Sequence, residues 1–201
     1  MNRGILFIAL KALEEVTKGI ISSQRIEKAG ETIRGSAIIA AIAGVGSGWL
    51  PGAGALVASA AWVATIWGMY VMINKDLGIS IKDNILKSLA SALLTNILAS
   101  AGSLILMFIG SMLLSFIPGL GSAGAIAIDG FIGYITVFTS GVLYIKLLTK
   151  LFKAGKGFNI ADGDVKKVAD DIVNESDISE IIKEGKQAFN EDKKAGKFKK
   201  Q

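Results

Sequence analysis

The sequence predicts an all-α, integral membrane fold: two helical hairpins, each centred on a Pro-Gly turn, with amphipathic cytoplasmic helices at both ends. Three observations lead to this prediction. Hydrophobic residues make up 51% of the chain and charged residues only 19%, which is unusual for a soluble protein. The tracts 35–74 and 88–128 contain no charged side chain. The only two prolines, Pro51 and Pro118, lie inside these tracts.

Each proline belongs to the same short pattern: an aromatic residue, an aliphatic residue, Pro, Gly, any residue and Gly. The pattern occurs at Trp49-Leu50-Pro51-Gly52-Ala53-Gly54 and again at Phe116-Ile117-Pro118-Gly119-Leu120-Gly121. Pro cannot donate to a helical hydrogen-bond ladder, and Gly tolerates the backbone angles of a tight reversal. We therefore expect hairpin turns formed by Pro51, Gly52 and Gly54, and by Pro118, Gly119 and Gly121.

Residues 1–34 are expected to form an amphipathic N-terminal helix with a break near Ala29-Gly30, because apolar residues recur there at helical spacing between charged ones. A secretory signal is not expected, since the apolar stretch before Lys11 is short and no small-residue cleavage site follows it. The segment fits a helix that lies on a membrane or packs on a partner.

The membrane domain is expected at 35–152, with hairpins at 35–74 and 84–150. A membrane span needs about 20 apolar residues, so each charge-free tract can hold two spans or one re-entrant pair, and the number of crossings stays open. The alternative is a hairpin buried inside a soluble helical shell. The flanking segments offer too little amphipathic helix to cover both hairpins, which favours the membrane.

Two rows of small side chains predict close contacts between helices. Ala60, Ala64 and Gly68 form a small-x-x-x-small row on the first hairpin. Such rows usually face neighbouring helices rather than lipid, so we expect homo-oligomers; the abundance of Ala and Gly in this region is the alternative explanation. The second hairpin carries a small, weakly polar face made of Ser91, Thr95, Asn96, Ala99 and Ser103.

Asp129 is the only Asp, Glu, Lys or Arg between Lys87 and Lys146. Acids inside a membrane are costly and often mark an ion or proton path. The alternative is that Asp129 caps the N-terminus of a span at 130–149, since Asp is a favoured capping residue.

The charged segments are expected to share one side of the membrane. Six Lys or Arg residues lie in 1–34, three in the connector 75–87, and thirteen from Lys146 onward, while both Pro-Gly turns carry none. The positive-inside rule then predicts that both termini and the connector lie on the cytoplasmic side, with both turns in or across the membrane. In the connector, Gly78 is typical of a helix C-terminus.

The end of the chain, 153–201, is expected to be a soluble, charged helical tail. Its segment 161–190 is typical of an amphipathic helix or helix pair with an interruption at 174–177, and it offers a surface for a cytoplasmic protein partner. On the first hairpin, Trp62, Trp67 and Tyr70 lie on the outbound arm, with Tyr70 near the end where interfacial aromatic residues are common.

No catalytic, cofactor-binding or metal site is expected. The chain has no Cys and no His, which excludes thiol nucleophiles, the usual zinc ligands and the usual general base. It also lacks a P-loop motif. We therefore expect neither an enzyme nor a nucleic-acid partner.

Four short segments carry a resemblance to a known family: Leu50-Pro51-Gly52-Ala53-Gly54, Lys75-Asp76-Leu77-Gly78-Ile79, Ile85-Leu86-Lys87-Ser88-Leu89 and Ile117-Pro118-Gly119-Leu120-Gly121. With these segments the chain resembles the YcjF-type hydrophobic membrane domain, a domain of unknown function that occurs in bacterial membrane proteins and at the C-terminal end of some Ras-like GTPases. The likeness spans about residues 45–150. It implies membrane association and helical hairpins, so the expected location is the bacterial cytoplasmic membrane, and it supplies no catalytic residues. A weaker, general likeness is to the hydrophobic hairpins of colicins.

The leading hypothesis is a non-enzymatic membrane protein that self-associates through its small-residue faces and acts as a scaffold or a partner-recruiting module. The alternative is a pore- or channel-forming protein of the toxin or effector type, using Asp129 and the Ser/Thr/Asn face. A third hypothesis is a soluble adaptor protein whose hairpins are covered by residues 1–34 and 161–190.

Overall fold

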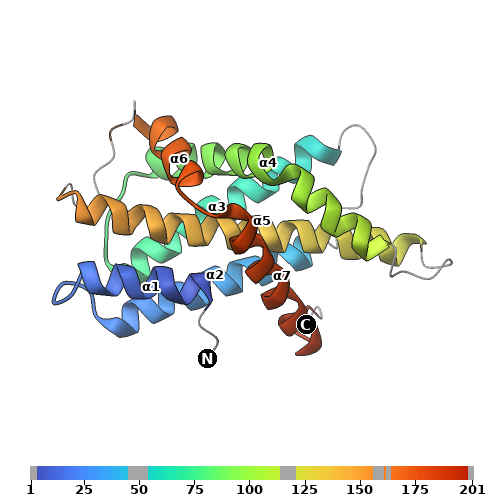
Figure 1. The fold of residues 1–201 in the computed structure, drawn as a ribbon, viewed down its shortest axis with the longest axis horizontal. Helices are drawn as coiled ribbons and strands as arrows, with labels where there is room; N and C mark the ends of the chain where they lie inside the picture. The colour runs from blue at the N-terminus through green and yellow to red at the C-terminus, as the bar shows by residue number, and fades with distance from the viewer. Residues whose placement is uncertain (1–3, 45–53, 114–120, 156–160, 162–163, 199–201) are drawn as a thin grey trace.

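The computed structural model describes residues 4–44, 54–113, 121–155, 161 and 164–198. Side chains at 55–61 and 101–129 lie outside this description. Within the described residues the chain forms seven α-helices and no strand (Figure 1), so the all-α prediction is confirmed. The helices are α1 (Ile5–Val16), α2 (Ser23–Gly44), α3 (Gly54–Leu77), α4 (Asp83–Leu113), α5 (Gly121–Lys153), α6 (Val165–Asn174) and α7 (Ile178–Lys194).

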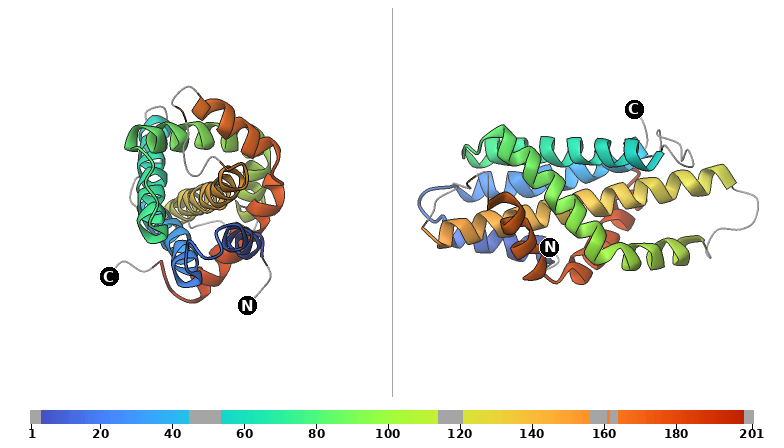
Figure 2. Two further views of the ribbon diagram at one scale, coloured as in Figure 1. Left: turned by 90° about the vertical axis from the view of Figure 1, so that its left-hand side faces the viewer. Right: turned by 90° about the horizontal axis from the view of Figure 1, so that it is seen from above.

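Helix α5 lies at the centre of the bundle. Viewed along the bundle in Figure 2, it passes through a ring made by the other six helices. Among the described helices, only the stretch Gly130–Lys153 is long and apolar enough to cross a membrane, and 89% of its apolar window is buried inside the protein. The core helix of a soluble bundle also has these properties, so the integral membrane hairpins remain a prediction.

Helix α2 packs most extensively against α5 among the described helices. Two glycines on α5 make this close approach feasible. A Cβ atom at Gly141 would lie 2.7 Å from Ile33 Cγ2, and one at Gly133 would lie 3.0 Å from the Ala40 carbonyl oxygen. Ile33 and Ala40 are themselves fully buried. Larger side chains at either glycine would therefore push α2 away from α5.

The bundle has one end with few charges and one end with many. Helices α2 and α4 end, and α3 and α5 begin, toward the right-hand end in Figure 1. The last turns of α3 and α5, with Lys75, Lys150 and Lys153, lie toward the opposite end. Helices α3 and α5 begin at Gly54 and Gly121, the last residues of the two Pro-Gly patterns. The turn residues Pro51, Gly52, Pro118 and Gly119 lie outside the described residues.

The N-terminal segment differs from its prediction. Helix α2 runs without interruption through Ala29 and Gly30, so the break expected there is wrong. The chain instead reverses between α1 and α2, where Gly19 adopts a φ of 81° that side-chain-bearing residues rarely adopt. The boundary expected between 34 and 35 consequently falls inside one continuous helix. Ala29 is fully buried, so tertiary packing outweighs the weak helix propensity of Gly30.

Two expected helix ends are confirmed. Helix α3 ends at Leu77, and Gly78 follows with a φ of 72°. Helix α6 ends at Asn174 and α7 begins at Ile178, with the Asp177 carboxylate accepting a hydrogen bond from the Glu180 backbone N–H at 3.0 Å.

Helices α6 and α7 belong to the shell around α5. Their apolar side chains, among them Ile172, Ile181, Ile182 and Phe189, are buried against the bundle. Together with α1 and α2, they cover α5 from Gly130 onward. This is more cover than the sequence predicts for the flanking segments. The apolar side of the segment proposed to recruit a partner is therefore already occupied by the chain itself.

Candidate functional site

The most highly connected polar group near α5 is the carboxylate of Asp192 on α7, which is fully buried. It accepts hydrogen bonds from Arg34 Nε at 3.0 and 3.1 Å and from the Tyr134 hydroxyl at 2.7 Å. Lys197 Nζ lies 3.0 Å from the same carboxylate. We call Arg34, Tyr134, Asp192 and Lys197 the Asp192 cluster. It connects α7 to α2 and to the central helix α5.

The electrostatics of the Asp192 cluster keep the carboxylate ionised. Burial opposes ionisation of Asp192, but hydrogen bonds from Arg34, Tyr134 and Lys197 outweigh it and hold the pKa of the carboxyl below its ordinary value of 3.8. The hydrogen bond to Asp192 raises the pKa of Arg34 in turn. Arg34 also reaches the exposed Glu191 carboxylate at 3.1 Å. The cluster therefore holds α7 against α2 and α5 through the buried Asp192 carboxylate, whose negative charge is compensated by Arg34 and Lys197.

A second polar cluster joins α3 to α5. The hydroxyl oxygens of Tyr70 and Ser140 lie 2.5 Å apart, and the Tyr144 hydroxyl donates to Asn74 Oδ1 at 2.6 Å. The two tyrosine rings stack with their centroids 4.0 Å apart. Tyr70 is fully buried, so its expected place at a membrane interface is wrong. Its ring fills the space between two helices, where the hydroxyl finds a partner.

Helix α7 also holds the start of α1. The half-buried Glu184 carboxylate accepts hydrogen bonds from the backbone N–H groups of Ile5 and Leu6, which no carbonyl of their own helix can satisfy. Burial raises the pKa of Glu184, although these two hydrogen bonds oppose the shift. A Cβ atom at Gly4 would collide with this carboxylate, so a larger residue there would require the Glu184 side chain to shift. Glu184 therefore acts as an N-terminal cap supplied by another helix.

The small-residue row of the first hairpin lies on an uncovered face of α3. Ala64 is exposed, and a Cβ atom at Gly68 would have no other atom within 4 Å. Val71 and Met72 continue the face and are 36% and 44% exposed. We call Ala64, Gly68, Val71 and Met72 the open α3 face. Ala60 precedes it by one turn, but its side chain lies outside the described residues.

The small polar face of the second hairpin is divided. Ser91, Thr95 and Ala99 are exposed, and Thr95 Oγ1 donates to the Ser91 carbonyl oxygen at 2.9 Å. Asn96 is half-buried and donates to the Asp170 carboxylate of α6 at 2.7 Å. The Ser103 side chain lies outside the described residues.

Asp129 lies well inside α5, which begins at Gly121. Position 129 is therefore not a helix N-terminus, and the capping alternative is wrong. The sequence suggested a cap because the residues from Gly130 onward are sufficient for a span; the helix nevertheless extends back to the Pro-Gly pattern. The Asp129 side chain lies outside the described residues, so its role as an intramembrane acid remains a prediction.

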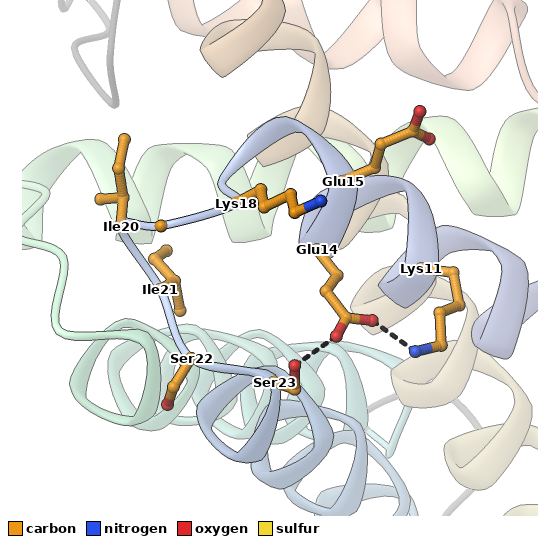
Figure 3. A pocket seen from close by; sticks show the side chains of 9 residues that line it. Lys11, Glu14, Glu15, Lys18, Ile20, Ile21, Ser22 and Ser23 are labelled. Carbon is orange, nitrogen blue, oxygen red and sulfur yellow. Dashed lines mark hydrogen bonds and ion pairs between the residues drawn. The ribbon is translucent and has the colours of Figure 1, made fainter.

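Several open hollows lie on the surface of the described residues. The largest described one, about 890 Å³, is an open depression at the α1–α2 turn (Figure 3). Its Glu14 carboxylate is already paired with Lys11 and Ser23. The exposed Ile20 forms part of its edge. No group of three or more acidic side chains among the described residues is placed to hold a metal ion.

No family model matches the chain, and no curated protein or solved structure matches it. The resemblance to the YcjF-type domain stays a prediction. The Asp192 cluster was not predicted from the sequence, although one signal was present. Gly185, Phe189 and Asp192 recur at helical spacing on α7, so a charged residue stands in the buried register. A charge in that register indicates a buried partner.

Proposed function

We propose that this chain is a non-enzymatic protein of the bacterial cytoplasmic membrane that self-associates and acts as a scaffold or a partner-recruiting module. The open α3 face carries the proposal. It is apolar, it lies in a charge-free tract, and no helix of the described chain covers it. Small residues at such a face let a second helix approach closely, and in a bilayer this packing stabilises the pair.

The distribution of charge along the bundle supports membrane embedding. The helix ends beside both Pro-Gly patterns point toward one end, and the basic last turns of α3 and α5 lie toward the other. In the proposed orientation the charge-poor end enters the bilayer, and the termini stay in the cytoplasm. The outer surfaces of α6 and α7 then remain available to a cytoplasmic partner.

Replacing Ala64 and Gly68 together by Leu tests self-association. We expect at least about a tenfold loss of cross-linked dimer in bacterial membranes, because two large side chains would hold the facing helices apart. Both positions are open in the single chain, so the fold itself should tolerate the change. The measurement is amine-reactive cross-linking followed by immunoblotting, with Ser88→Leu on an exposed part of α4 as the matched control. An unchanged ladder in Ala64→Leu/Gly68→Leu would reject the open α3 face as a contact.

The second candidate function is a pore or channel. One observation favours it: a helix that is long and apolar enough to span a membrane lies inside a ring formed by the other helices. This arrangement keeps an apolar span covered until it meets a bilayer. Dye or ion release from vesicles would support this function, whereas sealed vesicles with fully inserted protein would leave the scaffold.

A further inference from the structure

Helix α5 carries hydroxyl groups that the closed bundle leaves unpaired. Thr136 and Thr139 are fully buried, and neither Oγ1 atom has a hydrogen-bond partner among the described residues. By contrast, Thr149 on the same helix donates to the Ile145 carbonyl oxygen at 2.9 Å, and Thr17 makes the equivalent bond on α1. Unpaired threonine is therefore not general in this fold. A buried hydroxyl without a partner is unfavourable, and contact with water would satisfy it.

Polar groups continue along the helix beyond these threonines. Ser140 lies four residues after Thr136, one turn further along α5, and pairs with the Tyr70 hydroxyl. One turn later, Tyr144 donates to Asn74, whose Nδ2 atom has no partner among the described residues. Hydroxyl and amide groups thus form a buried polar seam on α5 beside α3.

The same register reaches the first part of α5. Asp129, Gly133, Thr136 and Ser140 are spaced at i, i+4, i+7 and i+11, which places these positions on one face of a continuous helix. Asp129 is the only Asp, Glu, Lys or Arg of α5 before Lys146. One face of the membrane-competent helix therefore combines an acidic position, a glycine and several hydroxyls.

We infer that the face of α5 bearing Thr136, Thr139 and Ser140 lines a hydrated path for small cations in the membrane-embedded protein. The inference rests on the proposed membrane embedding and goes beyond it. When the surrounding helices separate from this face in the bilayer, water hydrates the hydroxyls that the closed bundle leaves unpaired. The preference for cations over anions is expected from the acidic residue at position 129 of the same helix face.

The path is assigned to α5 in place of the Ser/Thr/Asn face of α4. On α4, the amide of Asn96 is engaged by Asp170, and Thr95 donates to a carbonyl of its own helix. These groups already have partners in the closed bundle, so hydration would add little for them. Thr136 and Thr139 of α5 have no such partners among the described residues, so contact with water would supply the hydrogen bonds that their hydroxyl groups lack.

Cysteine accessibility tests the path directly, because the natural chain has no Cys. Single variants Thr136→Cys, Ser140→Cys and Ile145→Cys are reconstituted in vesicles of phosphatidylethanolamine and phosphatidylglycerol. Ile145 is also fully buried and lies on the opposite side of the helix from Thr136, so it is the matched control. The probe is a cationic, water-soluble methanethiosulfonate reagent. Protein resistant to carbonate extraction reports insertion, and potassium efflux reports conduction.

We expect the reagent to modify Thr136→Cys and Ser140→Cys at least about tenfold faster than Ile145→Cys in vesicles and to reduce potassium efflux in those two variants only. All three should be protected in the closed bundle. Carbonate-resistant protein with all three positions protected would overturn the path and leave the membrane scaffold intact. Equal modification of all three would also overturn it, since no face would then be distinct. Failure to insert would reject both the path and the proposed function.

Discussion

Replacing Asp192 by Asn is expected to lower the free energy of unfolding by about 2–4 kcal/mol, because the buried side chain at position 192 loses the charge-assisted hydrogen bonds that Arg34 and Lys197 donate to its carboxylate. Arg34 is 39% exposed at its side chain and can turn toward water, which keeps the loss from being larger. For a chain of this length, that corresponds to a fall in melting temperature of about 5–15 °C. The measurement is thermal unfolding in mild detergent, followed by circular dichroism.

The neighbouring Glu191 provides the control. Glu191 also pairs with Arg34, but its side chain is 63% exposed, so Glu191→Gln should cost at most about 1 kcal/mol. The pH dependence gives a second readout. The folded-state pKa of Asp192 lies below the ordinary 3.8, so its contribution is complete above that value and is lost as the pH falls below it. Asp192→Asn should lack this acid-dependent loss. Equal, small effects of both variants would show that the cluster does not hold α7.

Replacing Gly141 by Leu is expected to have a similarly large effect. Even a Cβ atom there would lie 2.7 and 2.8 Å from the two γ-carbons of Ile33 and 3.2 Å from Met69 Sδ. Ile33 and Met69 are both fully buried, and Ile33 is branched at Cβ, so neither can move aside cheaply. Overpacking of this kind costs about 1–3 kcal/mol, and the longer leucine side chain places the variant at the upper end.

The control for Gly141→Leu is Gly35→Leu on α2. A Cβ atom at Gly35 would meet no other atom within 4 Å, and replacing Gly by Leu in a helix is favourable by about 0.5–1 kcal/mol. We therefore expect Gly35→Leu to melt at the same temperature as the natural chain or slightly above it. If Gly141→Leu also melts unchanged, then α2 does not pack on α5 as described.

Hydropathy and turn chemistry predicted the helices well, because both act over short stretches of chain. The start of α3 at Gly54, the start of α5 at Gly121 and the end of α3 before Gly78 all coincide with a glycine beside or within a reversal pattern. The continuous α2 could not be predicted in the same way. Gly30 suggests a break locally, and only the packing of its neighbour Ala29 in the core keeps the helix intact.

The site was predicted less completely, because it depends on contacts between residues far apart in the sequence. Arg34 and Asp192 meet although 158 positions separate them. Arg34 is not unusual within its own segment. Asp192 is unusual only because it occupies a helical position at which the neighbouring residues of α7 are buried. The open α3 face could be predicted from the small-x-x-x-small spacing of Ala64 and Gly68. The burial of Tyr70 could not be predicted, because an aromatic residue at the end of an apolar helix suits a membrane interface and a helix contact equally well.

The central claim is that the charge-poor end of the bundle enters the hydrocarbon core of a bilayer. All three tryptophans lie between positions 49 and 67, inside the first charge-free tract, so intrinsic fluorescence reports on this region alone. The measurement is quenching of that fluorescence in vesicles whose lipids carry bromine along the acyl chains, compared with a water-soluble quencher. Strong quenching by the brominated lipids, with protection from the aqueous quencher, is the predicted result. Protein that binds the vesicles but responds only to the aqueous quencher would contradict the account.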